Sequence, residues 1–77
     1  MNKEYSDSRE KIRKLLADFL GIEPEDVEDD FSLTEDLHMK STDLTDFSLN
    51  LSKEGFEAED LDFTEIETFT DLVDSIA

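Results

Sequence analysis

The chain has 77 residues, which suits one small domain over residues 1–77 and is too short for two. Its 7 lysines and arginines stand against 23 aspartates and glutamates, and the formal net charge of −16 excludes a protein that binds nucleic acid by neutralising phosphates. The sequence contains no cysteine. This excludes disulfides, thiol catalysis and cysteine-based zinc sites, and it fits a cytoplasmic location.

The sequence resembles neither a membrane protein nor a disordered chain. No window approaches about 18 uninterrupted apolar residues, so we expect no stable membrane insertion. The first residues, Met-Asn-Lys-Glu-Tyr, lack the apolar core of a secretion signal. High charge favours disorder, but Leu, Ile, Val and Phe supply 22 of the 77 residues. This share exceeds the level of about 20% below which highly charged chains stay unfolded.

Apolar residues in the first quarter of the chain recur with the period of an α-helix. The stripe consists of Ile12, Leu15, Leu16, Phe19 and Leu20. Asp7 and Glu10 have the spacing of a capping box, and Ser6 or Ser8 could cap the helix instead. Gly21 suits a left-handed C-terminal cap, with Ile22 as the apolar residue that packs back. The pattern predicts a helix over residues 8–20.

Residues 21–40 show no sustained period and are expected to form a long loop. Pro24 suits the first position of a single helical turn. Four spaced apolar residues would anchor the loop across the helices: Val27, Phe31, Leu33 and Leu37. A loop of about twenty residues is unusual in a small domain unless it is functional or disordered. The four anchors favour an ordered loop.

A second helix is expected to begin near Ser41 or Thr42, which are both candidate caps. Its inward stripe consists of Leu44, Phe47 and Leu51. Leu49 lies off this stripe and should be exposed. Gly55 is expected to end the helix.

A last helix is expected after Thr68, which is its candidate cap. Its stripe consists of Phe69, Leu72, Val73 and Ile76. Between the second and last helices, residues 56–63 should form a short helix or a turn. The expected fold is therefore a small all-α bundle of three main helices and a short fourth helical segment, with a long ordered loop between helices one and two.

Charge is distributed unevenly along the chain. Residues 1–14 contain five basic and three acidic residues, a net charge of +2, whereas residues 15–77 contain two basic and twenty acidic residues, a net charge of −18. An imbalance of this size suggests basic protein partners that are reached by electrostatic steering. The same imbalance predicts low stability at low salt, because the carboxylates repel one another.

The sequence offers little catalytic chemistry, and we do not expect an enzyme. His38 stands three residues before Ser41, but no orienting acid can be singled out, and an exposed histidine is the simpler interpretation. The acidic stretch at residues 25–30 lacks the alternating spacing, central glycine and terminal glutamate of a calcium-binding EF-hand loop. No metal site is expected. A carboxylate pair for glycoside hydrolysis would need a concave site, for which the chain leaves little room.

The segment Glu-Asp-Leu-His-Met-Lys-Ser-Thr-Asp-Leu at residues 35–44 resembles the acyl carrier protein signature, in which Glu-Asp-Leu-Gly-x-Asp-Ser-Leu opens helix two. The resemblance covers the whole chain. Residues 19–22, Phe-Leu-Gly-Ile, are similar to the family's end of helix one, and residues 24–27 fall in its early loop. The apolar residues of 66–76 are similar to its last helix, and length and acidity agree as well.

The resemblance implies that Ser41 carries 4′-phosphopantetheine, transferred from coenzyme A by a separate Mg²⁺-dependent phosphopantetheinyl transferase. The thiol of the arm would bear acyl groups as thioesters, sheltered near Leu44, Phe47, Phe69 and Leu72. The implied partners are the transferase and acyl-loading and acyl-processing enzymes with basic docking patches, which would meet Asp43 and Asp46. A helix N-terminus at Ser41 would suit the anionic phosphodiester. The expected carrier is a monomer.

Three residues depart from the family signature. Lys40 stands in place of the aspartate before the serine, Thr42 in place of the leucine after it, and His38 in place of the loop glycine. The departures indicate a specialised carrier for fatty-acid, polyketide or related biosynthesis. The first alternative is an unmodified acidic module of the same fold that binds a basic protein. The second is an acidic mimic that blocks a nucleic-acid-binding protein.

Overall fold

The computed structural model describes residues 3–58 and 61–76, and within them it contains three α-helices and one short 3₁₀ helix. The α-helices are α1 (Lys3–Leu20), α2 (Ser41–Lys53) and α3 (Phe69–Ile76), and the 3₁₀ helix is η1 (Pro24–Asp26). In the described part of the chain, pairing of β type is limited to one isolated bridge, between Ser32 and Thr68. The expected all-α class is confirmed.

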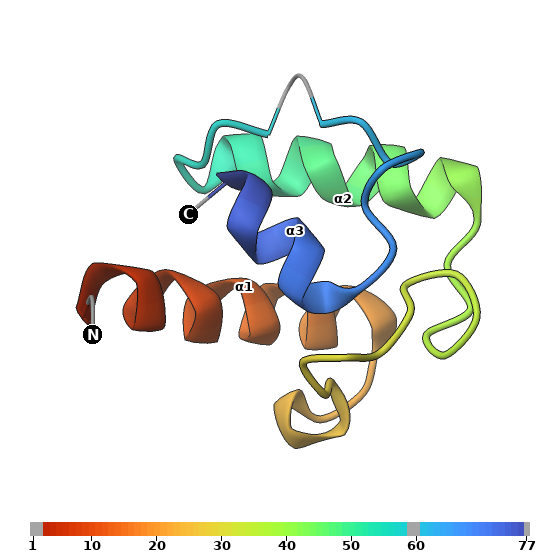
Figure 1. Cartoon of the computed structure of the whole chain (residues 1–77), viewed down its shortest axis with the longest axis horizontal. Helices are drawn as coiled ribbons and strands as arrows, with labels where there is room; N and C mark the ends of the chain where they lie inside the picture. Colours follow the sequence, from red (N-terminus) through yellow and green to blue (C-terminus); the bar gives the residue numbers. More distant parts are fainter. Residues whose placement is uncertain (1–2, 59–60, 77) are drawn as a thin grey trace.

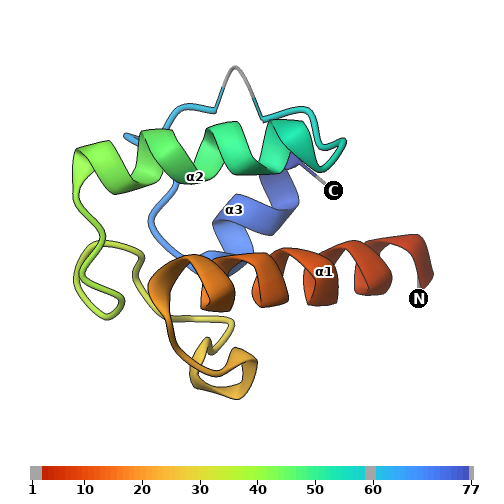
Figure 2. The same cartoon turned by 180° about the vertical axis from the view of Figure 1, so that it is seen from behind.

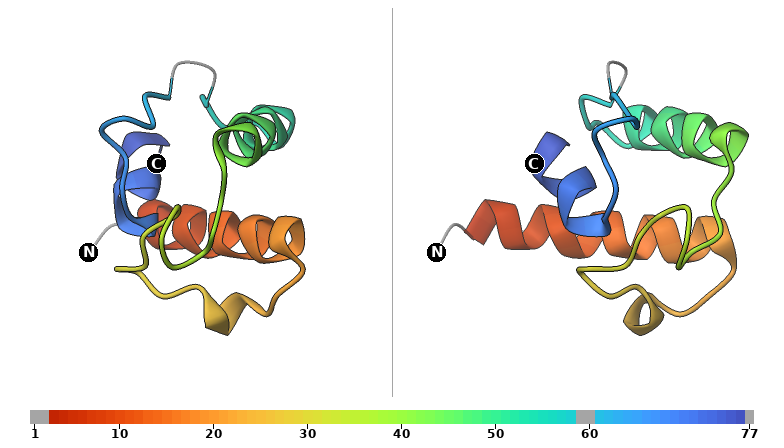
Figure 3. Two further views of the ribbon diagram at one scale, coloured as in Figure 1. Left: turned by 90° about the vertical axis from the view of Figure 1, so that its right-hand side faces the viewer. Right: turned by 45° about the vertical axis from the view of Figure 1, so that its right-hand side comes forward.

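The three α-helices enclose the core from three sides. Figure 1 shows α1 and α2 running in opposite directions, with the short α3 crossing between them. The view from behind gives the same order, and an end-on view places α3 to one side of the α1–α2 pair (Figures 2 and 3). The fully buried side chains come from all three helices and from the loops: Ile12, Leu16, Val27, Leu33, Phe47, Leu51, Phe69, Leu72 and Val73. The predicted apolar stripes therefore form the core.

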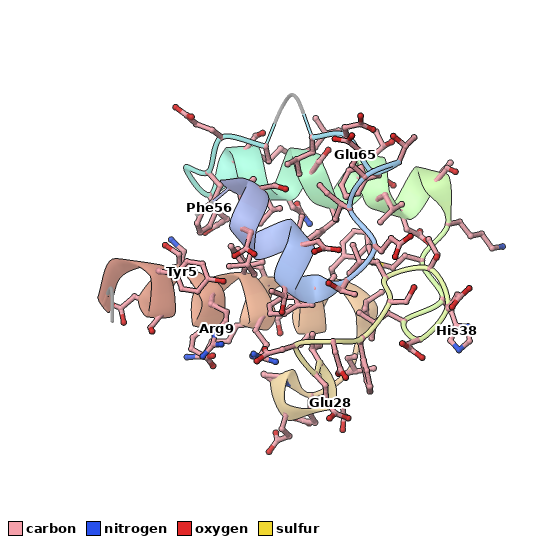
Figure 4. All side chains as sticks on the ribbon, in the orientation of Figure 1. Tyr5, Arg9, Glu28, His38, Phe56 and Glu65 are labelled. Carbon is pink, nitrogen blue, oxygen red and sulfur yellow. The ribbon has the colours of Figure 1, made fainter. Side chains whose placement is uncertain are left out.

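Helix α1 begins at Lys3, five residues before the predicted start at residue 8. The capping box expected at Asp7 is wrong, because this residue lies inside the helix. A tertiary contact accounts for the extra length: Tyr5 packs against the core, and its hydroxyl donates a hydrogen bond of 2.6 Å to Asp74 Oδ1 at the other end of the chain. Figure 4 shows Tyr5 reaching from α1 toward α3. The hydrogen bond to the Asp74 carboxylate raises the pKa of Tyr5.

The C-terminal end of α1 has the predicted left-handed glycine cap. Gly21 has a φ of 73°, and the backbone N–H of Ile22 donates to the carbonyl oxygen of Ala17 at 3.0 Å, the bond typical of this cap. The expectation that the Ile22 side chain packs back is wrong, because 37% of that residue remains exposed. The cap consists of backbone bonds, since the N–H of Gly21 also donates to the carbonyl oxygen of Asp18 at 3.3 Å.

The loop of residues 21–40 is tied to the N-terminal end of α3. Thr70 donates from both its backbone N–H and its hydroxyl to the carbonyl oxygen of Asp29, at 3.0 and 2.8 Å. Phe69 N–H donates to the Phe31 carbonyl at 3.0 Å. Of the four predicted anchors, Val27 and Leu33 are buried and the other two are half-buried. The loop is ordered, as expected, and η1 is the single turn predicted at Pro24.

Helix α3 is capped by Thr68, as predicted. The Thr68 hydroxyl accepts a hydrogen bond of 3.1 Å from Asp71 N–H. In return, the backbone N–H groups of Thr68 and Glu67 donate to Asp71 Oδ2, both at 3.2 Å. These hydrogen bonds hold the pKa of Asp71 below its usual value. The result is a reciprocal capping box in which aspartate takes the place of glutamate.

The segment between α2 and α3 contains no helix among its described residues. The short helix or turn expected over residues 56–63 is not found at 56–58 or 61–62, and a turn lies at residues 63–65 instead; residues 59 and 60 lie outside the described part. Phe56, Leu61 and Phe63 pack against the core as anchors. No helix in the described chain combines the length and the apolar character needed to cross a membrane.

Candidate functional site

Ser41 is the first residue of α2, and its side chain lies exposed at the helix N-terminus. The sequence predicted Ser41 or Thr42 as the cap, and this is wrong: the N-cap residue is Lys40, with a φ of −92° and a ψ of 170°. The Ser41 hydroxyl makes no hydrogen bond to any residue that the structure describes, whereas its backbone carbonyl accepts one from the Thr45 hydroxyl at 3.1 Å. The hydroxyl is therefore available to an approaching enzyme.

The cap of α2 is built by Asp43 and not by a hydroxyl. The Asp43 carboxylate accepts a hydrogen bond of 2.9 Å from the backbone N–H of Lys40. The Lys40 ammonium group can only donate, and this side chain makes no cap hydrogen bond. Because its carboxylate is turned to the helix end, Asp43 is half-buried. Asp46, in contrast, is exposed.

The residues before Ser41 form a compact turn that leads into α2. The backbone N–H of Ser32 donates to Asp36 Oδ2 at 2.7 Å, and the N–H groups of Asp36 and Leu37 donate to the Ser32 carbonyl at 3.0 and 3.1 Å. Met39 N–H then donates to the Leu33 carbonyl at 3.0 Å, and the Met39 side chain is buried. The turn is thus closed by its own carboxylate, which explains why an acid stands at position 36.

His38 has a left-handed backbone, with a φ of 59°. Of the residues that the structure describes, it is the one other than glycine with a positive φ. Its side chain is exposed and points away from the helices (Figure 4). It makes no hydrogen bond to Ser41 within the part of the chain that the structure describes. The exposed histidine expected from the sequence is found.

The N-terminus of α2 provides the electrostatic setting for a phosphate group. The first N–H groups of a helix have no carbonyl partner within the helix and give its N-terminus a partial positive charge. Lys40 and His38 are both exposed beside it. A shallow hollow of about 230 Å³ opens at the same place, lined by Ser41, Thr42, Thr45 and Asp46. An exposed hydroxyl, free N–H groups and a nearby cation fit a covalently attached phosphodiester.

Metal ligands do not gather at this site. In the ranges 3–58 and 61–76, no group of three or more His, Asp or Glu side chains is arranged to hold a metal ion. The acidic stretch at residues 25–30 is spread over η1 and the loop after it, with Glu28 at the edge of the molecule in Figure 4.

Comparisons with known proteins agree with this geometry. Residues 10–76 match the protein family described as "Phosphopantetheine attachment site". The chain belongs to the acyl carrier protein family.

Several relatives in this family are similar over most of their length. The acyl carrier protein of Nitratidesulfovibrio vulgaris (strain DP4) is 35% identical over 69 residues, which cover 88% of this chain and 91% of the relative. Acyl carrier proteins of Chlamydia trachomatis serovar D and Chlamydia muridarum are 35% and 33% identical over 63 residues, covering 80% of this chain and 82% of theirs. Such proteins are carriers and not catalysts, and their cofactor is covalently attached 4′-phosphopantetheine.

Proposed function

We propose that this acyl carrier protein carries its 4′-phosphopantetheine arm on Ser41. The observation that supports this site is the exposed Ser41 hydroxyl at the first position of α2, which no described residue engages. Ser41 Oγ attacks the β-phosphate of coenzyme A, forms a phosphodiester and releases the nucleotide part of coenzyme A. The terminal thiol of the bound arm supplies the group that holds acyl cargo as a thioester.

The residues around Ser41 stabilise the product of this transfer. The N-terminal N–H groups of α2 face the phosphodiester with the positive end of the helix dipole. Lys40 adds a counter-charge next to the phosphate. The general base and the Mg²⁺ come from the transferase, so the chain needs no catalytic side chain of its own. This agrees with the Ser41 hydroxyl having no hydrogen-bond partner among the residues that the structure describes.

We also propose where the acyl cargo lies. The four residues expected to shelter it are all buried at the centre of the bundle: Leu44, Phe47, Phe69 and Leu72. No Cα atom of α2 lies within 8 Å of one in α3, so the backbones of these two described helices are not closely packed on each other. Side chains can move aside more easily than packed backbones, which makes this the most accessible route for an acyl chain into the core.

The residues flanking Ser41 support a specialised carrier for fatty-acid, polyketide or related biosynthesis. Lys40, Thr42 and His38 differ from the family signature at the positions nearest to the attachment site. The same differences favour a second candidate function, an unmodified module that binds a basic protein. In both candidate functions, the protein is a monomer in the cytoplasm. Both use carboxylates of α2, such as that of the exposed Asp46, against basic patches of partner enzymes.

Intact mass spectrometry tests the proposed site. The chain is incubated with coenzyme A, Mg²⁺ and each of several phosphopantetheinyl transferases. We expect the wild-type protein to gain the mass of one arm, Ser41→Ala to gain none, and Thr42→Ala, which removes the neighbouring hydroxyl, to be modified. Uptake by Ser41→Ala would refute the site. If no transferase modifies the wild-type chain, the unmodified module becomes the better explanation.

A further inference from the structure

Four hydroxyl side chains lie in one line along α2 and lead away from its N-terminus. They are spaced at i, i+4, i+7 and i+11, which places them on one face of the helix, and we call them the hydroxyl ridge: Ser41, Thr45, Ser48 and Ser52. Thr42 is the one other hydroxyl residue among the 13 residues of α2. At a rise of about 1.5 Å per residue, the ridge is about 16 Å long.

The hydroxyl ridge borders the apolar core on the side of α2 that faces away from α1. Phe47 marks the side toward α1, because the centroid of its ring lies 5.5 Å from that of Phe19. At about 100° per residue, the buried Leu51 and Leu44 follow Phe47 around the helix, and the hydroxyl ridge comes next. Cargo that enters the core beside Leu44 therefore passes along the hydroxyl ridge.

Burial increases along the hydroxyl ridge with distance from the attachment site. Ser41 and Thr45 are exposed, and both line the hollow of about 230 Å³ at the start of α2. Ser48 and Ser52 are half-buried. The Oγ atom of Ser52 is itself buried, with less than 1 Å² accessible to solvent. The hydroxyl ridge thus leads from the surface of the protein to its interior.

The hydroxyl at the inner end of the ridge has no hydrogen-bond partner among the described residues. Hydroxyl groups in helices commonly donate to a carbonyl one turn back. Thr45 and Ser48 do so, to the carbonyl oxygens of Ser41 and Thr45 at 3.1 and 2.8 Å. Ser52 Oγ makes no such bond. Because a buried hydroxyl without a partner is unfavourable, Ser52 is poised to donate to a ligand and to accept from it.

Helix stability does not explain the hydroxyl ridge. Serine and threonine are weaker helix formers than alanine or leucine. At half-buried positions beside the core, an apolar side chain would also bury more apolar surface than Ser48 and Ser52 do. Residues that break local rules without a local gain are expected at functional sites.

We propose that the hydroxyl ridge selects the cargo, and that this carrier holds acyl chains with a hydroxyl or keto oxygen close to the thioester. The inference rests on the proposed function of Ser41. An arm of about thirteen bonds from phosphorus to sulfur spans about 15 Å when extended, so Ser52 is within reach of its thioester end. Ser52 Oγ forms a hydrogen bond with the oxygen of such a cargo, whereas a plain alkyl chain leaves this buried hydroxyl unpaired.

The test compares three cargoes of equal length on the same protein. A transferase that loads the wild-type chain transfers the complete acyl arm from octanoyl-, β-hydroxyoctanoyl- or β-ketooctanoyl-coenzyme A. The hydrolysis rate of each thioester on coenzyme A, divided by its rate on the protein, gives a protection factor for that cargo. We expect the protection factors of the two oxygenated cargoes to exceed that of octanoyl about fivefold, the scale of one net hydrogen bond.

One substitution identifies the hydroxyl that acts. Ser52→Ala should remove the advantage of the oxygenated cargoes and leave the protection factor of octanoyl unchanged or raised. Ser75→Ala is the matched control, because Ser75 is an exposed serine of α3 whose hydroxyl donates to the Asp71 carbonyl at 2.9 Å. This control should change no protection factor. Circular dichroism verifies that each variant is folded.

The pattern of protection factors decides the inference. A larger factor for one of the two oxygenated cargoes supports it and names the group that is carried. Equal protection of all three cargoes, or stronger protection of octanoyl, would overturn the inference while Ser41 remains the attachment site. An advantage that Ser52→Ala retains would also overturn it, because the hydroxyl ridge would not be the cause. A wild-type chain that no transferase loads would overturn the proposed function and this inference with it.

Discussion

The guanidinium group of Arg13 lies over the ring of Phe69, 4.8 Å from the ring centroid, and so joins α1 to the first residue of α3. The same group donates to the carbonyl oxygen of Val27 and pairs with the carboxylate of Asp29. Only 14% of the Arg13 side chain is exposed. One side chain thereby connects both helices to the loop that precedes Ser41.

We expect Arg13→Ala to lower the free energy of unfolding by about 2–3 kcal/mol, because it removes a desolvated cation–π contact, the hydrogen bond to the Val27 carbonyl and one of the two arginine partners of Asp29, of which Arg9 remains. Arg13→Lys should recover only part of the loss. An ammonium group cannot stack on the Phe69 ring as a planar guanidinium group does, and it lacks the fork of N–H donors that a guanidinium group offers. Urea unfolding followed by circular dichroism measures both. Lys14→Ala, at the neighbouring exposed position, should change stability by less than about 0.5 kcal/mol. Equal effects at both positions would contradict the role of Arg13.

The left-handed backbone of His38 predicts a gain in stability on substitution by glycine. His38→Gly should raise the free energy of unfolding by about 0.5–1 kcal/mol, because glycine adopts a positive φ without steric strain, and this gain exceeds the added freedom of the unfolded chain. His38→Ala separates the backbone from the side chain: it also removes the imidazole but keeps the strain, so it should give no gain. Thermal unfolding of the three proteins provides the comparison.

The capping box of α3 predicts a specific pH dependence. The pKa of Asp71 is lowered in the folded protein from an ordinary value of 3.8 by hydrogen bonds from Thr68 and Glu67. A carboxyl group with a lowered pKa stabilises the fold above its unfolded pKa, and this contribution is lost as the pH falls through the folded pKa. Asp71→Asn should therefore be less stable than wild type near neutral pH, and the difference should shrink below pH 3.8.

Urea unfolding between about pH 2 and about pH 7 tests this dependence, because carboxyl groups in folded proteins titrate within that range. Asp18→Asn, at an exposed position in α1, is the control for the loss of one negative charge. A difference between wild type and Asp71→Asn that stays constant over the whole range would show that the cap does not act through the charged carboxylate.

The excess of acidic residues predicts that salt stabilises the protein. A net charge of −16 produces repulsion among surface carboxylates, and screening shortens its range from about 30 Å at 0.01 M ionic strength to about 3 Å at 1 M. The urea midpoint should rise steadily with sodium chloride, since urea is uncharged and does not itself screen. A falling midpoint would mean that the ion pairs of Arg9 and Arg13 outweigh the repulsion.

The local features of this protein were predictable from its sequence. The stripes of α1, α2 and α3, the glycine at the end of α1 and the Thr68 cap involve residues within about five positions of one another, a distance over which helix geometry dictates the contacts. The position of Ser41 at the start of α2 follows from the same rules and from the resemblance of residues 35–44 to the family signature. Only the structure shows that Ser41 is exposed and that its hydroxyl makes no hydrogen bond to a described residue.

The features that the sequence did not predict depend on contacts between residues far apart in the chain. Helix α1 begins early because Tyr5 meets Asp74, 69 residues away, and no local capping rule includes such a partner. The loop before Ser41 is held by α1 and α3 together, through Arg13 and Thr70. A helical period can be recognised from residues within a few positions of one another. These partners, in contrast, become neighbours only when the core forms.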